Sequence, residues 1–333
     1  MTLTAPVLTG DGHVGSRTVR RPQPGPGQLV LRCRANAICG SDRGLFRTGS
    51  TTIAGHEAAG EVVAAGTETT TPAGSRGVVY LMSYCGRCRS CAAGATNVCL
   101  DKGGDMGFNR DGGLGPYELV EERMFFPVAD SIPFPVATML LDVMGTSGHA
   151  LDRALAVRPD IASIHIAGAG PVGLGALIMS QIRFGPDVPV HISDVSDWRL
   201  DLAASFGAEP VRASEVGRLA PFDLAIDASG RTAARVAAVR QLTPRGVLVC
   251  VGHGEELVLD VSPDLIAKEV TVMGSEYFPY ADLVRNHGLL LEHRELLDRV
   301  ITHEFDVSRV GEAFDTFFAS RTGKVVVTQD ADV

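Results

Sequence analysis

The chain has 333 residues, with 30 Lys and Arg against 39 Asp and Glu scattered along it, which gives a formal net charge of −9. This balance argues against a surface that holds a phosphate backbone, so we expect no nucleic-acid partner. No uninterrupted apolar run reaches the roughly 18 residues of a membrane helix, and the first residues carry no basic and apolar leader. We therefore expect a soluble, cytoplasmic protein without a membrane partner.

The first part of the chain is rich in short β-type runs. These runs are separated by Gly, Pro, Ser and Asp turns, and they lie at residues 28–38, 58–66, 77–82 and 117–128. Short runs with such turns are typical of strands in an irregular, strand-rich domain. We predict this domain over residues 1–133.

Four of the seven cysteines fall close together in this domain, at Cys85, Cys88, Cys91 and Cys99. A chain long enough for two cores does not need disulfides, and clustered thiols in a reducing cytosol are more often zinc ligands. Four thiolates complete a tetrahedral zinc shell with no open position. The spacing of these cysteines therefore predicts a structural zinc site in a lobe of residues 84–100, and an Fe–S cluster or a thiol switch is the alternative.

From residue 134 onward, helical apolar spacing alternates with buried β runs. The β runs lie at residues 163–170, 189–195, 222–229, 246–252 and 270–278. Repeated β-α-β units predict an α/β domain with a doubly wound parallel sheet and helices on both faces, over residues 134–279. Residues 280–333 predict two amphipathic helices and a last strand, which we expect to rejoin the first domain.

A glycine-rich turn follows the first of these β runs. Gly168 permits a tight turn, Gly170 lets backbone approach a pyrophosphate, and Gly173 allows close packing of the next helix. A glycine-rich turn without a ligand is the alternative. The motif as a whole predicts a dinucleotide site made by Gly168, Gly170, Pro171, Val172 and Gly173.

The next β run ends in Asp194, where a carboxylate would hold the ribose hydroxyls of an adenosine. The same carboxylate would repel the extra phosphate of NADP, so NAD is favoured. Arg199 could still contact the ribose or the adenine, or lie on a solvated helix face, which leaves NADP open.

A second group of metal-ligating residues is dispersed. Cys39 lies in "AICGSD", His56 and Glu57 lie in "AGHEAAGE", and Asp142 lies in "LLDVMGTSGHA". Taken singly, these are a buried Cys, a core His, and a helix-capping Asp. Together they offer the mixed sulfur, nitrogen and oxygen ligands of a catalytic zinc site with room for a substrate oxygen.

The motifs "CGSD", "GHE", "GGLGPYELV" and "GAGPVG" and the four-cysteine lobe occur in an order that resembles the zinc-dependent medium-chain alcohol and polyol dehydrogenases, over residues 5–330. The resemblance implies a GroES-like first domain, a Rossmann second domain and a C-terminal segment that returns to the first. It also implies two zinc ions per chain and a homodimer or homotetramer.

The resemblance assigns roles to single residues. It implies Cys39 and His56 as catalytic zinc ligands, Glu57 as a nearby or exchangeable ligand, Asp142 as an oxygen ligand or water-bridged carboxylate, and Ser41 as the hydroxyl that passes on the alcohol proton. Nicotinamide and ribose contacts would come from Thr146, Val251, Gly252 and Ser275, and adenosine contacts from Ala228 and Ser229. Where many members have a relay histidine, this chain has Gly44.

The resemblance implies an oxidoreductase that transfers a hydride between NAD(H) and a secondary alcohol or ketone. We expect a polyol, sugar alcohol or (amino)cyclitol substrate, because the expected pocket residues are polar and charged. These are Arg43, Phe46, Arg47, Asp105, Met106, Phe108, Met144, Glu276 and Tyr277. The alternatives are an enzyme for simple or aromatic alcohols, or a catalytically silent member.

Overall fold

The computed structural model describes residues 2–329, which form two compact units. Among the described residues, the first unit comprises residues 2–141 and 279–329, and the second comprises residues 142–278. None of the helices in the described residues combines the length and the hydropathy of a membrane span.

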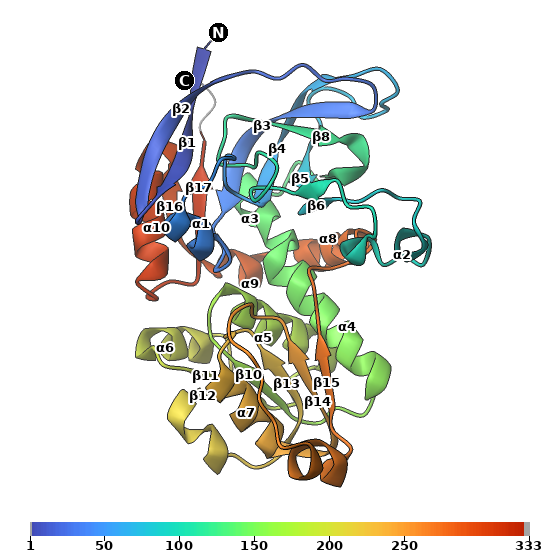
Figure 1. Ribbon diagram of the computed structural model, residues 1–333, viewed down its shortest axis with the longest axis vertical. Coiled ribbons are helices and arrows are strands. Elements are labelled where there is room, and N and C mark those ends of the chain that lie inside the picture. The colour runs from blue at the N-terminus through green and yellow to red at the C-terminus, as the bar shows by residue number, and fades with distance from the viewer. Residues whose placement is uncertain (1, 330–333) are drawn as a thin grey trace. The chain divides into compact units, whose positions relative to one another are not determined.

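The first unit is built on a seven-stranded sheet in the order β16-β17-β3-β4-β5-β9, with β8 also paired to β3. Its strands are β3 (Gln28–Ala37), β4 (Glu57–Ala65), β5 (Arg76–Val79), β8 (Tyr117–Glu121), β9 (Phe125–Pro127), β16 (Ile301–Asp306) and β17 (Lys324–Thr328). Because β17 pairs antiparallel with β3, the C-terminal segment extends the sheet that the N-terminal residues begin (Figure 1).

Smaller elements complete this unit. Two short sheets are formed by β1 (Thr2–Gly10) with β2 (His13–Arg20), and by β6 (Met82–Ser83) with β7 (Gly104–Asp105). The helices are α1 (Asp42–Thr48), α2 (Arg89–Ala92), η1 (Thr96–Val98), η2 (Glu122–Met124), α3 (Phe134–Ala137), η3 (Thr138–Leu140), α8 (Asp282–Glu292), α9 (Arg294–Asp298), η8 (Val307–Arg309) and α10 (Val310–Phe318).

An aromatic cluster joins α1 to the C-terminal helix α10. The rings of Phe46 and Phe314 stack with centroids 5.1 Å apart, and Phe318 packs on Phe46 at 5.3 Å. Phe46 is 7% exposed and Met106 is 1% exposed. Phe46 thus packs in the core of the first unit, and a role of Phe46 and Met106 in lining a substrate pocket stays a prediction.

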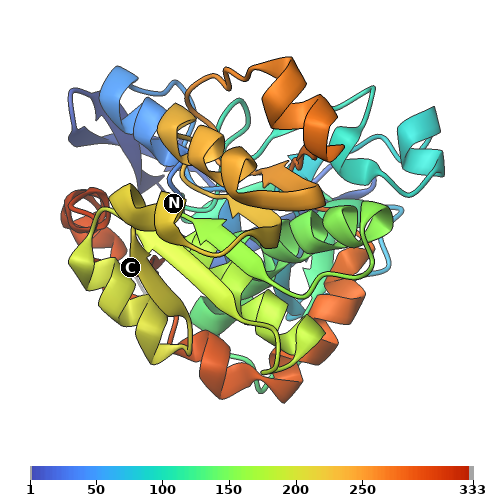
Figure 2. The same ribbon diagram turned by 90° about the horizontal axis from the view of Figure 1, so that it is seen from below.

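The second unit is a six-stranded parallel sheet in the order β12-β11-β10-β13-β14-β15. Its strands are β10 (Ile164–Ala167), β11 (Val190–Asp194), β12 (Glu209–Arg212), β13 (Phe222–Asp227), β14 (Leu242–Cys250) and β15 (Thr271–Gly274). From β10 the chain first runs outward through β11 to β12, and then outward on the other side through β13 and β14 to β15. Because such crossovers are right-handed, α5 (Pro171–Phe184) and α6 (Asp197–Ser205) lie on one face of the sheet, and α7 (Thr232–Gln241) lies on the opposite face. Figure 2 shows helices on both sides of these strands, which confirms the predicted doubly wound sheet.

The remaining helices of this unit are η4 (Asp142–Thr146), α4 (Ser147–Val157), η5 (Ala213–Arg218), η6 (Val261–Leu265) and η7 (Ile266–Lys268). η4 is a single turn of π-helix that leads directly into α4. A Cβ on Gly175 would lie 2.1 Å from the carbonyl oxygen of Val143, so only glycine lets α5 pack this closely on the backbone of η4. Ligands bind such sheets at the carboxyl ends of the strands, where the strand order reverses.

Candidate active site

Three of the predicted zinc ligands lie at strand ends in the first unit. Cys39 follows β3, and His56 and Glu57 stand at the start of β4; all three side chains are buried. Since β3 and β4 are paired antiparallel from Ala37 to Glu57, the sheet register brings these residues to the same place.

Asp42 orients two of these ligands, and sequence reasoning did not assign it a role. Its Oδ2 accepts a hydrogen bond from the Cys39 N–H at 2.9 Å, and its Oδ1 lies 3.4 Å from His56 Nδ1. A carboxylate at Nδ1 fixes the ring so that Nε2 is left to bind a metal. The aspartate that ends "CGSD" was the available signal, but the sequence does not reveal that it faces His56.

Asp142 follows Leu141 at the junction where the second unit begins. It opens the π-turn η4, and Thr146 Oγ1 donates a hydrogen bond of 3.0 Å to its Oδ1. One potential ligand atom from each of Cys39, His56, Glu57 and Asp142 lies within 4.8 Å of the others. A thiol, an imidazole and carboxylates gathered in a buried place fit the donor chemistry of zinc.

Glu57 also has a buried cationic partner that sequence reasoning missed. Lys324, the first residue of β17, donates from Nζ to Glu57 Oε1, and both side chains are fully buried. A buried charge is costly unless it is paired, so Lys324 balances the carboxylate and holds one of its oxygens.

The surface beside these ligands is open at two predicted positions. Ser41 is exposed and makes no capping hydrogen bond at the start of α1. A Cβ on Gly44 would meet no atom within 4 Å. The backbone at Gly44 therefore has room for a Cβ.

The residues predicted to line the pocket have different surroundings. The Phe108 ring packs 5.1 Å from the His56 ring, whereas Asp105 pairs with Lys102 at 2.9 Å. Arg43 lies over the Phe318 ring at 4.3 Å. Of these, Phe108 is the side chain whose contact places it beside the metal ligands.

The four clustered cysteines converge in a loop of the first unit. Their sulfurs lie within 4.8 Å of one another, with Cys85 and Cys91 at 4.0 Å and Cys88 and Cys99 at 3.9 Å. Four sulfurs at about 2.3 Å from one zinc ion lie about 3.8 Å apart, so this spacing fits a tetrahedral Zn site.

Backbone N–H groups point at these sulfurs. Cys88 Sγ accepts hydrogen bonds from the N–H groups of Cys91 and Leu100, and these bonds lower the pKa of Cys88 to about 6. Cys85 Sγ accepts from the N–H of Arg87, which lowers the pKa of that thiol. Metal ligation needs thiolates, so the loop backbone prepares the cysteines for a metal.

The glycine turn of the second unit has the geometry of a nucleotide-binding turn. Gly168 has φ of +97°, and a Cβ on Gly173 would lie 1.8 Å from the carbonyl oxygen of Gly168. Pro171 and Val172 begin α5 directly after Gly170. The turn therefore brings a helix N-terminus to the carboxyl end of β10, where it can face a pyrophosphate.

Asp194 and Arg199 lie beside this turn. The Asp194 carboxylate accepts hydrogen bonds of 2.8 Å from the N–H groups of Ala169 and Ser196. An Arg199 guanidinium nitrogen lies 3.6 Å from the place of a Cβ on Gly170. The aspartate thus ends β11 next to the turn, and the arginine reaches the turn rather than solvent alone.

The other predicted nucleotide contacts lie at the carboxyl ends of β13, β14 and β15. Ala228 and Ser229 follow β13, Val251 and Gly252 follow β14, and Ser275 follows β15. The Ser229 hydroxyl donates to Asp227, whereas the Ser275 hydroxyl is buried without a hydrogen-bond partner among the described residues. Because a buried hydroxyl without a partner is costly, Ser275 is suited to receive a ligand.

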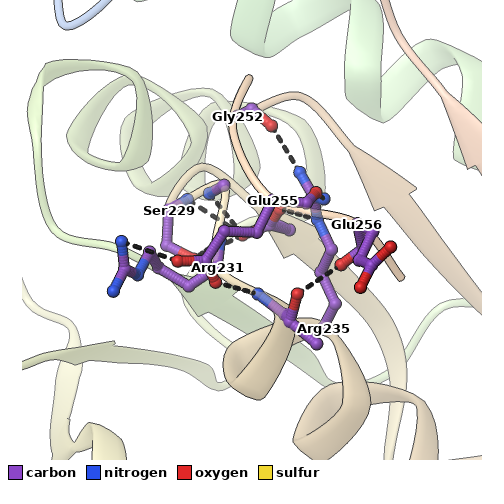
Figure 3. Close-up of polar contacts among 9 residues, drawn as sticks. Ser229, Arg231, Arg235, Gly252, Glu255 and Glu256 are labelled. Atoms are coloured by element: carbon purple, nitrogen blue, oxygen red, sulfur yellow. Dashed lines mark hydrogen bonds and ion pairs between the residues drawn. The ribbon is translucent and has the colours of Figure 1, made fainter. Parts of the chain in front are cut away.

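Arg235 ties these strand ends together, as Figure 3 shows. It donates to Asp227 at 2.6 Å, to the carbonyl of Gly252 at 2.5 Å and to the carbonyl of Glu255. The other oxygen of this carboxylate, Asp227 Oδ1, accepts hydrogen bonds from the hydroxyl and the N–H of Ser229. The loop after β14 is therefore held rigidly against the loop after β13.

Comparison with known proteins agrees with this geometry. Residues 25–130 match the alcohol dehydrogenase GroES-like domain, and residues 171–285 match the zinc-binding dehydrogenase family. The L-threonine 3-dehydrogenase of Saccharopolyspora erythraea is 30% identical over 328 residues, which cover 92% of this chain and 93% of the relative.

Two further proteins are similar over nearly their whole length. YphC of Escherichia coli K12, an uncharacterized zinc-type alcohol dehydrogenase-like protein, is 27% identical over 98% of both chains. The solved structure of the alcohol dehydrogenase TADH from Thermus sp. ATN1 has a TM-score of 0.89 and 23% identity, and the match covers 98% of this chain and 100% of that one. The chain is thus an oxidoreductase that belongs to the zinc-dependent medium-chain alcohol dehydrogenase family, with the GroES-like and Rossmann domains that its sequence predicts.

Proposed function

We propose that the protein oxidises a secondary alcohol of a polyhydroxylated compound, such as a polyol, sugar alcohol or (amino)cyclitol, with NAD as the hydride acceptor. The main observation in support of this proposal is the group of potential zinc ligands in which Asp142 lies close to Cys39, His56 and Glu57. Carboxylate oxygens make a zinc ion harder than thiolates do, which suits binding of a hydroxyl oxygen.

The residues of this group would divide the work. When bound, zinc supplies a Lewis acid that lowers the pKa of an alcohol oxygen. Cys39, His56 and Asp142 would hold the metal, while Asp42 and Thr146 orient the imidazole and the carboxylate. The exposed Ser41 hydroxyl would take over the alcohol proton and pass it outward.

The turn of the second unit would hold the nucleotide. When bound, NAD supplies the carbon that accepts the hydride. The Asp194 carboxylate at the turn would accept hydrogen bonds from ribose hydroxyls and repel a phosphate there, which supports NAD over NADP. Arg199 beside Gly170 supports an added contact with the pyrophosphate.

The cysteine loop would hold a second, structural zinc, giving two zinc ions per chain. Its sulfur spacing and N–H donors support this, and a closed four-thiolate shell leaves no position for a substrate.

An assembly of identical subunits and a cytoplasmic location remain predictions from the sequence. The segment between β14 and the edge strand β15 exposes the apolar side chains of Val258, Val261 and Ile266, which supports a contact between copies of the chain.

Oxidation of L-threonine is the second candidate. It is favoured by the similarity to the Saccharopolyspora erythraea enzyme, whose name gives threonine as its substrate. Threonine is also a secondary alcohol, and it bears an amine, so it shares chemistry with an aminocyclitol.

The test follows NADH formation by the zinc-loaded protein with acyclic polyols, inositols, aminocyclitols, L-threonine and simple alcohols, each with NAD and with NADP. We expect turnover on a polyol or cyclitol with NAD. Preference for simple alcohols would contradict the substrate proposal, and preference for threonine would favour the second candidate. Cys39→Ser is the matched control, because it removes a zinc ligand and leaves the nucleotide unit intact.

A further inference from the structure

We infer that Arg235 is a positioning residue for hydride transfer, because it fixes the loop on which the nicotinamide end of the nucleotide is expected to rest. This inference rests on the proposed function, since it requires that a nicotinamide nucleotide binds at the carboxyl edge of the parallel sheet. It assigns a role to a buried ion pair that the metal site and the predicted nucleotide contacts leave unused.

Arg235 lies in α7 and pairs with Asp227, the last residue of β13. Its Nε lies 2.6 Å from Asp227 Oδ2, and the two side chains are 9% and 0% exposed. The other guanidinium nitrogens donate to the carbonyl of Gly252, at 2.5 Å, and to the carbonyl of Glu255 (Figure 3). One buried side chain therefore contacts the end of β13 and two points of the loop that follows β14.

The loops that follow β13 (residues 228–230, the β13 loop) and β14 (residues 251–256, the β14 loop) touch through their backbones. A Cβ on Gly230 would lie 2.2 Å from the carbonyl oxygen of His253, and a Cβ on Gly252 would lie 2.5 Å from the nitrogen of Gly230. The Glu255 N–H donates a hydrogen bond of 2.8 Å to the carbonyl of Gly230. The two loops therefore form one surface at the edge where such sheets bind their ligands.

Arg235 contributes differently to the two loops. The β13 loop is held by Asp227 itself, whose Oδ1 accepts hydrogen bonds from the N–H groups of Ser229 and Gly230. In the β14 loop, the N–H of Gly252 is bound by the carbonyl of Asp227, whereas the carbonyls of Gly252 and Glu255 are bound by Arg235. Loss of the guanidinium should therefore loosen the β14 loop more than the β13 loop.

This difference separates the two ends of the nucleotide. The adenosine contacts are predicted in the β13 loop, at Ala228 and Ser229, and the nicotinamide contacts in the β14 loop, at Val251 and Gly252. Hydride transfer requires the nicotinamide carbon to lie close to the alcohol carbon, and a small displacement lowers the rate strongly. Arg235 therefore acts on the reaction through the backbone that carries the nicotinamide contacts.

The planar guanidinium suits this role. It binds a carboxylate and two carbonyls at the same time, in directions that its fork keeps fixed. A lysine would keep the positive charge beside Asp227 but offers a single nitrogen on a flexible stem. Arg235→Lys thus keeps the buried charges balanced and removes the fixed contacts with the β14 loop.

The same unit contains a second Arg–Asp pair at the opposite edge of the sheet. An Arg158 nitrogen lies 2.5 Å from Asp223 Oδ1, and the two side chains are 11% and 10% exposed. Arg158 also donates to the carbonyl of Pro244, at 3.3 Å. Asp223 and Pro244 lie near the amino ends of β13 and β14, away from the predicted nucleotide contacts, so this pair is a matched control.

The first test measures the Kd of NADH, from its fluorescence on binding, and the Kd of ADP-ribose, which lacks the nicotinamide, by competition. It compares the wild type with Arg235→Lys and with the double variant Asp227→Asn/Arg235→Met, which leaves no buried charge without a partner. We expect the Kd of NADH to rise about 10-fold in both variants, because the loosened loop must be ordered on binding, and that of ADP-ribose to change less than about 3-fold.

The control double variant is Asp223→Asn/Arg158→Met. Guanidinium unfolding should show a loss of stability in this protein too, whereas its affinity for NADH should equal that of the wild type. A similar loss of NADH affinity in both double variants would overturn the inference, because any missing buried pair would then weaken binding. Wild-type NADH affinity in both Arg235 variants would overturn it as well.

A second readout separates kcat from KM. At saturating NAD, Arg235→Lys should lower kcat for an alcohol substrate about 10–100-fold, the size expected for a small misplacement of the reacting groups. The KM for the alcohol should change little, since its predicted ligands lie elsewhere. A wild type that binds NADH but oxidises no alcohol would contradict the proposed function, and the binding comparison would still decide the role of Arg235.

Discussion

Replacing Glu118 by glutamine should stabilise the first unit, and more so as the pH rises. Glu118 lies in β8 and is 1% exposed, and neither carboxylate oxygen accepts a hydrogen bond from the described residues. Burial raises the pKa of Glu118 from 4.5 to about 8, Asp111 adds to the rise, and Arg110 opposes it. The neutral acid is thus the form that folding favours.

The magnitude follows from proton linkage. A raised pKa in the folded state contributes stability that is fully present below pH 4.5 and is lost as the pH rises toward about 8. Each pH unit in that window removes about 1.4 kcal/mol, so the loss between pH 4.5 and pH 7.5 amounts to about 4 kcal/mol. Glutamine has nearly the same shape and no charge, so Glu118→Gln escapes this loss.

The assay is guanidinium unfolding of the wild type and Glu118→Gln at several pH values from 5 to 8. The difference in the free energy of unfolding should grow steadily with pH in favour of the variant. Equal pH dependence in the two proteins would refute the reasoning. Glu122→Gln is the control, because burial raises the pKa of Glu122 but hydrogen bonds from Thr71 and Thr70 outweigh it, so the net lowering confines its effect to acid pH.

Three further changes test the sites. Asp142→Ala should abolish alcohol oxidation while the cysteine loop keeps its zinc, as measured by turnover and by the zinc content of the variant. Full activity of this variant would contradict the assignment of Asp142 as a metal ligand. Thr146→Val should weaken metal affinity or activity by about 10–100-fold, measured by competition with a chelator, because it removes the hydrogen bond to Asp142. Asp194→Ala should raise kcat/KM with NADP relative to NAD, and an unchanged ratio would contradict the role of that carboxylate at the ribose.

Features fixed by nearby residues were accessible from the sequence. Backbone geometry requires the glycines of the turn, because a Cβ on Gly173 would lie 1.8 Å from the carbonyl oxygen of Gly168. The cysteines bring one another together because their spacing fits a single loop whose N–H groups reach the sulfurs. Such features need no knowledge of the rest of the chain.

Side-chain direction was harder to predict, as Phe46 illustrates. It stands in α1 only four residues after Asp42, which faces His56, yet its ring packs into the aromatic cluster of α10. Residues four positions apart lie on the same face of a helix, and both side chains are buried in α1, yet they contact different partners. A residue's position in a family motif therefore did not determine which way its side chain points.

Two ion pairs join segments that are not neighbours in the sequence, which is why no local pattern shows them. Lys324 reaches Glu57 across 267 positions because β17 joins the sheet beside β3, and β3 in turn pairs with β4. His253 meets Glu276 because β14 and β15 are adjacent and parallel. In both cases the sheet order determines the partner, so a change of partner needs a change of topology rather than of one residue. The motifs predict the metal ligands, whereas the buried cation that pairs with Glu57 became visible only with the strands in place.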